Sequence, residues 1–278
     1  MTRSVETQAE PRTLAPPERR VARVVANTEL GAYRLITADD SGGPPDPYPG
    51  QFYMLATAED WSVEDGRPYL PRAFSYARAR AAGAGVTLEF LLEAVGPGTE
   101  RLAALAADDG LALVGPLGIG FRAGDEAGAA LLVGGGIGSA PLLCLQEALP
   151  EARVLLGFRS AAHARAADLF DSPRVVTDDG SVGRRALVTE LLREELQREP
   201  EARVFACGPP PMLEAVRLLC AELGTPAQLA LESGMACGFG ACFGCVVPTR
   251  DGYVRLCLEG PVVDAERLES ALFPGAGH

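Results

Sequence analysis

The chain has 278 residues, 47% of them apolar and 22% charged, which is typical of a globular protein with room for two domains and a small third. Its net charge of −12 argues against a nucleic-acid partner, because nucleic acids are bound by basic surfaces. All 25 basic residues are arginines, which excludes Schiff-base chemistry and a Walker-type phosphate lysine, and only two histidines are available for a hydrolase or a metal site.

The location of the chain is predicted from its N-terminus and its cysteines. Residues 1–18 are polar and rich in proline and lack the apolar centre of a signal peptide, so we expect a disordered tail. No apolar run approaches the ~20 residues that cross a bilayer. The seven cysteines, an odd number, do not indicate a disulfide framework. A cytoplasmic protein is predicted.

Residues 19–123 are predicted to form an antiparallel β-barrel. Short segments with strand character alternate with glycine- and proline-rich turns, and a short helical pattern covers residues 100–107. The strand segments are 21–30, 31–39, 51–58, 73–80, 85–95 and 110–118. Many short strands of this kind favour a small barrel.

Residues 124–226 are predicted to form a Rossmann-like parallel α/β domain. Residues 129–149 read as an apolar strand, a glycine turn and an apolar helix. Three further apolar runs, at 152–158, 174–179 and 202–208, alternate with helical patterns at 184–197 and 210–223. Strands alternating with helices at this spacing indicate a parallel sheet. Residues 227–278 are predicted to form a third segment, which the cysteine motif described next marks as cluster-binding, with an acidic helical pattern at 264–272.

Four cysteines in this last segment carry the strongest motif. Cys237, Cys242, Cys245 and Cys257 have the spacing C-x4-C-x2-C followed by eleven residues and a cysteine, as in plant-type [2Fe–2S] proteins. The intervening glycines allow the loop to curl around a cluster and point its amides at sulfur. An apolar shell around the metal is expected from Met235, Phe239, Phe243 and Val246. A zinc ion held by cysteines is the alternative, although its ligands usually come as two short knuckles.

Two barrel motifs suggest a flavin nucleotide. Arg72, Ala73, Phe74 and Ser75 form an R-x-F-S tetrapeptide, in which arginine could grip a pyrophosphate and serine a flavin edge. The sequence G-P-G-T at residues 96–99 precedes a helical turn and could bind an anion. Each motif alone also fits a surface strand or a turn with Thr99 as N-cap. Together, in this order, they point to a flavin nucleotide.

Two motifs of the α/β domain suggest a nicotinamide nucleotide. The glycine turn GGGIGSAP at residues 134–141 lies between a strand and a helix, where bare amides can approach a pyrophosphate. The sequence CGPPPM at residues 207–212 follows another strand, at the sheet edge where ligands of open α/β sheets bind. Cys207 could also be a packed core residue.

The order R-x-F-S, G-x-G-T, GGGIG-x-x-P, CGP-x-x-M and C-x4-C-x2-C resembles the ferredoxin–NADP reductase superfamily. More narrowly, it is similar to the electron-transfer subunits of NAD-dependent dihydroorotate dehydrogenases, from about residue 21 to residue 268. This resemblance implies three sets of ligands. FAD would be held by Arg72, Ala73, Phe74, Ser75, Leu91, Leu92, Glu93, Gly98 and Thr99. NAD would be held by Gly134, Gly135, Gly136, Gly138, Cys207, Gly208, Pro209 and Met212. A [2Fe–2S] cluster would be held by the four cysteines.

The resemblance also implies a function in pyrimidine biosynthesis. Electrons from an FMN-containing dihydroorotate dehydrogenase catalytic subunit would pass through the cluster and FAD to NAD⁺, in a heterotetramer of two of each subunit, with no side chain acting as acid or base. The alternatives are the small subunit of an NADH-dependent reduced ferredoxin–NADP oxidoreductase or a sulfide dehydrogenase, and a non-enzymatic redox-sensing or scaffold protein. Arg159 and Arg165 could meet a 2′-phosphate, so NADP remains open.

Overall fold

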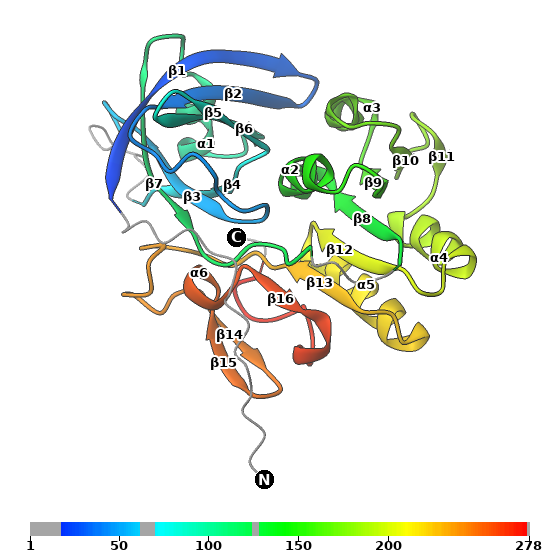
Figure 1. Cartoon of the computed structure of the whole chain (residues 1–278). Coiled ribbons are helices and arrows are strands. Elements are labelled where there is room, and N and C mark those ends of the chain that lie inside the picture. The colour runs from blue at the N-terminus through cyan, green and yellow to red at the C-terminus, as the bar shows by residue number, and fades with distance from the viewer. Residues whose placement is uncertain (1–17, 62–69, 124–127, 277–278) are drawn as a thin grey trace.

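The computed structural model of the chain describes residues 18–61, 70–123 and 128–276, so residues 1–17 of the predicted tail lie outside these ranges. Figure 1 shows an antiparallel sheet in blue to green, a parallel sheet with helices in green to yellow, and a C-terminal hairpin region in orange. Among the helices of the described residues, none is long and apolar enough to cross a membrane.

The first sheet has seven antiparallel strands in the order β4-β3-β7-β1-β2-β6-β5. Their bounds are β1 Arg19–Leu30, β2 Tyr33–Asp40, β3 Phe52–Thr57, β4 Arg72–Ser75, β5 Arg78–Ala82, β6 Gly85–Leu92 and β7 Gly110–Leu117. The two edge strands, β4 and β5, are consecutive in the chain and are separated only by Tyr76 and Ala77, both buried. The sheet therefore curls towards closure as a half-barrel, and one predicted strand becomes two at this corner.

The second sheet has seven strands in the order β11-β10-β9-β8-β12-β13-β16. Their bounds are β8 Ala130–Gly135, β9 Arg153–Phe158, β10 Arg174–Thr177, β11 Arg184–Arg185, β12 Arg203–Cys207, β13 Ala227–Ala230 and β16 Val262–Asp264. All neighbours pair in parallel except β13 and β16. The chain lays β9 on one side of β8 and β12 on the other, so the strand order reverses between β8 and β12.

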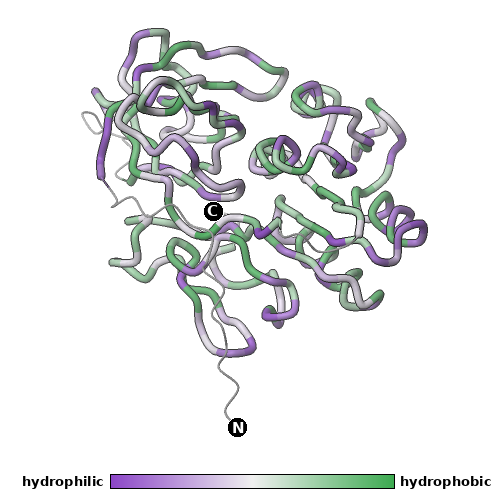
Figure 2. The backbone as a smooth tube through the Cα atoms, viewed as in Figure 1, coloured by the Kyte–Doolittle hydropathy of each residue, from purple (hydrophilic) through white to green (hydrophobic). Residues whose placement is uncertain are grey.

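Helices cover both faces of this sheet because its strands are apolar on both sides. Leu131 and Val133 of β8 face the helices α4 (Val188–Arg198) and α5 (Pro210–Leu223), whereas Leu132 faces α2 (Ala140–Ala148) and α3 (Ala161–Ala164). The second face also packs against the barrel, through residues such as Tyr33. Figure 2 shows hydrophobic green along the central strands. The remaining helices are α1 (Pro97–Ala103) and α6 (Leu256–Glu259).

The cluster-binding segment is inserted between two strands of the parallel sheet. After β13 the chain forms a glycine-rich loop, the hairpin β14 (Val246–Thr249) and β15 (Gly252–Arg255), and α6, and then returns as β16 beside β13. Leu231 N donates to Pro261 O at 2.9 Å, so both ends of the insertion lie side by side. The domain boundaries at 123/124 and 226/227 stay predictions, and the parallel sheet itself continues past the second of them.

The acidic helical pattern at residues 264–272 is wrong as a helix prediction. Only a three-residue 3-10 helix, Ala265–Arg267, forms there. Leu268 and Ala271 are buried in the core below the sheet, and Ala271 N donates to the Glu214 carboxylate at 2.6 Å. These contacts hold the segment in an irregular conformation that a continuous helix could not reach.

Candidate cofactor sites

The strand order places two predicted motifs together at the carboxyl edge of the parallel sheet. The glycine turn follows β8 and the CGPPPM sequence follows β12, and these two strands are neighbours at the point where the strand order reverses. Ligands of open α/β sheets bind at such a point. A Cβ added to Gly138 would lie 2.5 Å from Gly208 Cα, and one added to Gly135 would lie 2.4 Å from Met212 Sδ. The two loops therefore touch, and only glycine fits between them.

A cavity of about 580 Å³ joins this edge to the barrel. Its walls come from all three parts of the chain: the R-x-F-S strand β4, the turn before α1, the glycine turn, Cys207, and residues 231–235 just before the first cluster cysteine. Such a cleft between domains, lined by apolar groups and a few convergent polar ones, is where a nucleotide cofactor binds. We therefore take this cavity as the candidate location of the predicted flavin and nicotinamide sites.

Most predicted nucleotide-binding residues of the barrel line this cavity, but not all of them do. Its lining includes Arg72, Ala73, Phe74, Ser75, Leu91, Glu93, Thr99, Gly138 and Cys207. Leu92 is instead buried in the barrel core, because alternate residues of β6 face opposite sides. The remaining predicted residues are not part of the cavity lining: Gly98, Gly134, Gly135, Gly136, Gly208, Pro209 and Met212. The binding roles of all these residues stay predictions.

Arg72 brings the two barrel motifs into contact. A Cβ on Gly98 would lie 2.7 Å from the Arg72 Nε, so the guanidinium lies directly against the G-P-G-T turn. Arg72 donates to Leu70 O at 2.5 Å and stacks 6.0 Å from the Trp61 ring. No ion pair of Arg72 occurs among the described residues. A guanidinium that lies against this turn without a carboxylate partner is suited to bind a pyrophosphate.

Thr99 has a different role at the start of α1 from the N-cap that the sequence allows. Gly96 is the N-cap, and Thr99 lies three residues into the helix. The Thr99 hydroxyl accepts hydrogen bonds from Val95 N at 2.9 Å and Gly96 N at 3.1 Å, and it donates to Gly96 O at 3.0 Å. It therefore fixes the shape of the turn against which Arg72 lies.

Cys207 and Glu232 face each other across the sheet edge. Burial raises the pKa of the Cys207 thiol well above its usual value, and the nearby Glu232 carboxyl adds to the effect. Burial also raises the pKa of Glu232. A thiol with a raised pKa is a poor nucleophile at neutral pH. Cys207 is thus suited to pack against a ligand rather than to attack it.

Cys237, Cys242 and Cys245 lie in the glycine-rich loop and Cys257 lies in α6, and side-chain hydrogen bonds link Cys237 with Cys242 and Cys245 with Cys257. Cys237 Sγ accepts the backbone N–H of Ala241 at 3.3 Å and that of Cys242 at 3.4 Å. Cys245 Sγ and Cys257 Sγ lie 3.3 Å apart and share a hydrogen bond. The loop curls because Gly238 and Gly240 adopt positive φ values of 80° and 86°. Two pairs of sulfurs correspond to the two irons of a [2Fe–2S] cluster, each of which takes two thiolates.

The loop favours the deprotonated form of two of these thiols. Burial opposes ionisation of Cys237, but backbone N–H groups, first that of Cys242, outweigh it and lower its pKa to about 7. The hydrogen bond with Cys257 lowers the pKa of Cys245 to about 6, and the same bond, together with burial, raises the pKa of Cys257. Thiolates are the form that binds iron.

The pairing of the sulfurs favours a two-iron cluster over a single zinc ion. A tetrahedral zinc site would need all four sulfurs around one centre. The donor set, the amides directed at sulfur and the division into pairs fit a two-iron cluster.

The expected apolar shield around the loop is only partly formed. Met235 lies at the cavity wall, but Phe239 and Phe243 are 48% and 62% exposed, and the Arg255 guanidinium lies 5.2 Å from the Phe243 ring. Cys242 is exposed as well, whereas Cys245 and Cys257 are buried. The outer side of the cluster loop is therefore an open surface with two aromatic rings.

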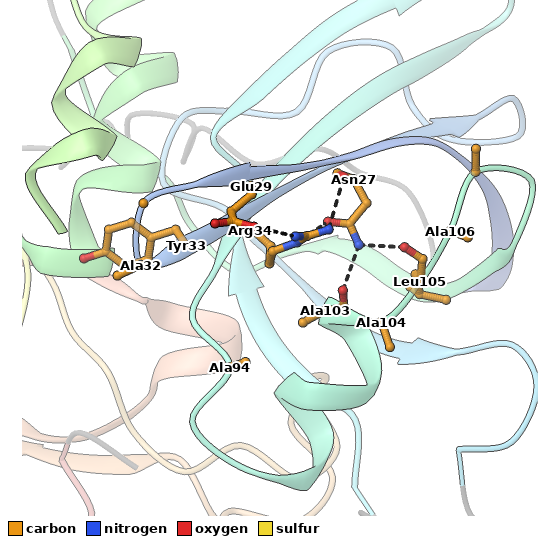
Figure 3. A pocket seen from close by; sticks show the side chains of 12 residues that line it. Asn27, Glu29, Ala32, Tyr33, Arg34, Ala94, Ala103, Ala104, Leu105 and Ala106 are labelled. Carbon is orange, nitrogen blue, oxygen red and sulfur yellow. Dashed lines mark hydrogen bonds and ion pairs between the residues drawn. The ribbon is translucent and has the colours of Figure 1, made fainter. Parts of the chain in front are cut away.

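A second hollow, of about 750 Å³, is larger but contains no predicted site residue. It lies between the β1–β2 hairpin and the end of α1. Figure 3 shows the Asn27 amide pointing at the carbonyl oxygens of Ala103 and Leu105, at 3.0 and 2.6 Å, and Arg34 donating to Asn27 at 2.9 Å. Its polar side chains bind each other and its floor is mostly alanine, so we place the cofactors in the smaller cavity.

Sequence reasoning missed several residues that line the cofactor cavity. Phe52, Leu231, Glu232 and Pro261 belong to it, although no motif contains Phe52 or Pro261. Glu232 could have been found, because it lies two residues after β13 and only five residues before the first cysteine of the motif. Phe52 and Pro261 are brought in by tertiary packing alone.

Comparison with known proteins agrees with this geometry. The half-barrel, the parallel sheet and the cysteine loop define a ferredoxin reductase-like oxidoreductase with an added iron–sulfur module. Residues 232–269 match the family model described as the iron–sulfur cluster binding domain of dihydroorotate dehydrogenase B. The chain belongs to the family of electron transfer subunits of dihydroorotate dehydrogenase B (NAD(+)).

Two relatives and two solved structures illustrate this membership. The subunit of Caldanaerobacter subterraneus is 35% identical, over 89% of this chain and 97% of its own. That of Clostridium acetobutylicum is 34% identical, over 87% and 94%. The structure of an NADH-dependent reduced ferredoxin–NADP oxidoreductase superposes with a TM-score of 0.77 at 25% identity, covering 90% of both chains. A ferredoxin reductase of carbazole 1,9a-dioxygenase, at 24% identity, has a TM-score of 0.62 over 77% and 68% and shows the fold alone.

Family membership confirms the predicted fold class and the predicted electron-transfer function. The expected set of FAD, NAD and an iron–sulfur cluster agrees with the fold and the matched domain. An electron transfer subunit also implies a catalytic partner subunit.

Proposed function

We propose that this chain carries electrons from the FMN of a dihydroorotate-oxidising partner subunit, through a [2Fe–2S] cluster and FAD, to NAD⁺. The observation that carries the proposal is the cofactor cavity, whose wall at residues 231–235 continues into the cysteine loop at Cys237. Flavin supplies the conversion between one- and two-electron chemistry when it is bound. The side chains of this chain bind, orient and shield, and none of them is required to move a proton.

In this proposal Cys237 and Cys242 hold one iron, and Cys245 and Cys257 hold the other. The loop that carries the first three cysteines is fixed against the barrel, because a Cβ on Gly238 would lie 2.5 Å from Met54 Cγ of β3. Close packing of this kind keeps the cluster loop at a constant distance from the flavin cavity, which electron transfer requires.

On the flavin side, Arg72 binds the pyrophosphate, and Phe74 and Ser75 lie along the isoalloxazine. On the nicotinamide side, Gly138 admits the dinucleotide close to the backbone, and the neutral Cys207 thiol packs beside the nicotinamide. The mostly apolar lining would shield a bound flavin and nicotinamide from water.

The partner subunit docks on the outer side of the cluster loop. Phe239 and Phe243 are exposed there beside Cys242, and aromatic rings with a neighbouring arginine are enriched at protein interfaces. We further propose an assembly of two chains with two partner subunits, in the cytoplasm.

Anaerobic mixing tests the proposal. The full chain, purified with its cofactors, should contain two irons, two sulfides and one FAD, and NADH should bleach its oxidised flavin in a stopped-flow instrument. Dihydroorotate should bleach the same flavin only when the partner subunit is added. A chain that contains the cofactors but whose flavin does not respond to NADH would contradict the proposal.

The choice between possible partners is tested by the same experiment. An NADH-dependent ferredoxin–NADP oxidoreductase shares the fold, so its large subunit is the alternative partner. Replacing Phe243 with Asp should weaken binding to the true partner at least tenfold, and the matched change Tyr253→Asp, on the distal hairpin, should not. Tyr253 is a suitable control because it is 78% exposed.

A further inference from the structure

The Glu93 carboxylate of the barrel reaches Arg159 at the edge of the parallel sheet, beside the cofactor cavity. Arg159 follows β9 directly, and Glu93 follows β6. Arg159 Nη2 donates to Glu93 Oε1 at 2.7 Å. Arg159 Nη2 also lies 2.8 Å from His163 Nε2, and His163 Nδ1 lies 2.9 Å from Ser160 Oγ. The same His163 Nε2 lies 3.4 Å from Glu93 Oε1, so the histidine ring packs against both members of the ion pair. These contacts hold the arginine in one place.

Arg159 lies at the position whose side chain contacts the adenosine ribose in dinucleotide-binding folds. The second strand of the βαβ unit, which here is β9, ends where the adenosine ribose lies, about 20 residues after the glycine turn. A carboxylate at this position accepts the 2′-hydroxyl of NAD, whereas an arginine accommodates the 2′-phosphate of NADP. By sequence alone, Arg159 therefore favours NADP.

The ion pair reverses this preference. Arg159 is 67% exposed and could be reached by a phosphate, but its charge is already balanced by Glu93, which is only 25% exposed. The same edge carries more negative charge on the neighbouring strand. There Asp179 Oδ1 accepts from Ser181 Oγ at 2.6 Å, and Ser181 Oγ accepts from Ala161 N at 2.7 Å. A phosphate with about two negative charges would meet carboxylates rather than a free guanidinium.

We infer that Glu93 determines the selectivity of this chain for NAD(H) over NADP(H) by neutralising Arg159 across the domain interface. This role rests on the proposed function of the cavity and adds to it, because it assigns the discrimination to a barrel residue outside the nucleotide domain. The second candidate arginine, Arg165, does not take part. It pairs with Asp168 at 2.8 Å, and its stem packs under Gly31 of the β1–β2 turn.

The test compares two small ligands that differ only in the 2′-phosphate. Calorimetric titration of the cofactor-loaded full chain with 5′-AMP and with 2′,5′-ADP gives a ratio of dissociation constants. Glu93→Gln should shift this ratio towards 2′,5′-ADP on the order of tenfold, or about 1.4 kcal/mol. Asp168→Asn frees the other arginine and serves as the matched control, with a change of less than twofold. Equal ratios in the two variants would overturn the inference.

A second variant keeps the test decisive if Glu93→Gln loads its flavin poorly. In the presence of Glu93, Arg159→Ala should leave the ratio within threefold, because Arg159 is not available to a phosphate. In the Glu93→Gln background, Arg159→Ala should abolish the gain. A tenfold loss of 2′,5′-ADP binding on Arg159→Ala alone would show that Arg159 already grips the phosphate. NADH bleaching of the wild-type flavin tests the proposed function separately.

Discussion

Gly238 gives the sharpest test of how the cluster loop is held. Its φ of 80° is a left-handed conformation, which costs an alanine about 1–2 kcal/mol. An added Cβ would also lie 2.5 Å from Met54 Cγ and 3.1 Å from Leu117 Cδ1, and both of these side chains are buried. Overpacking of this kind costs about 1–3 kcal/mol. Gly238→Ala should therefore destabilise the loaded chain by about 2–5 kcal/mol.

Gly83→Ala is the matched control, because Gly83 has a φ of 61° but no atom within 4 Å of an added Cβ. Gly83→Ala should lose only the unfolding free energy that a left-handed backbone conformation costs an alanine. The assay is urea unfolding of the cofactor-loaded chain, followed by the visible absorbance of the cluster, with iron and sulfide content measured before each titration. Since cofactor loss accompanies unfolding, the difference between the two variants is the quantity to compare. We expect Gly238→Ala to unfold with a free energy about 1–3 kcal/mol lower than that of Gly83→Ala. Its iron content should also be lower.

Equal stability and equal iron content in the two variants would refute the reasoning. That result would mean that the loop does not depend on its contact with the barrel strand. Truncating the barrel partner, in the double variant Met54→Ala/Gly238→Ala, checks the cause. It should recover part of the iron content lost in the single Gly238 variant, because it removes the overlap but not the backbone strain.

Three further predictions follow from single side chains. Cys257→Ser should remove most of the iron and sulfide, measured chemically, whereas Cys220→Ser, in α5 and far from the loop, should leave the iron content unchanged. Arg72→Ala should weaken FAD binding at least tenfold, because charge-assisted hydrogen bonds contribute about 1.5–3 kcal/mol each, and fluorescence of released flavin would report it. Hydrogen bonds from Arg217 lower the pKa of Glu214 to about 2, so its contribution to stability is present above its unfolded pKa near 4.5 and is lost as the pH falls towards 2. Glu214→Gln should flatten this part of the pH dependence of unfolding, and an unchanged slope would contradict it.

The sequence predicted the motif order and the sheet types because these depend on local patterns. The apolar runs of β8, β9 and β12 need only alternation with helices to indicate a parallel sheet. The cysteine spacing needs only the chemistry of two irons. Each of these patterns lies within a short stretch of residues, so it can be recognised from one sequence without knowledge of the tertiary structure.

The remaining features depend on contacts between distant segments. The wall residues Phe52 and Pro261 reach the cavity only after the barrel and the insertion have packed together. The neutralisation of Arg159 is hidden in the sequence, because Glu93 lies 66 residues away on another sheet. The exposure of Phe239 and Phe243 was not expected either, since an apolar ring in a glycine loop fits a buried shell equally well until the loop conformation is known.

The insertion between β13 and β16 has a consequence for how such a protein could have arisen. Its first and last residues are hydrogen-bonded neighbours, so the iron-binding part leaves and rejoins the sheet at one point and could have been added there without rerouting the strands. A reductase with only FAD and NAD sites could gain or lose its iron–sulfur segment, and with it the ability to accept single electrons, in one genetic step. The module would then determine which donor the enzyme serves, while the hydride chemistry stays with the older scaffold.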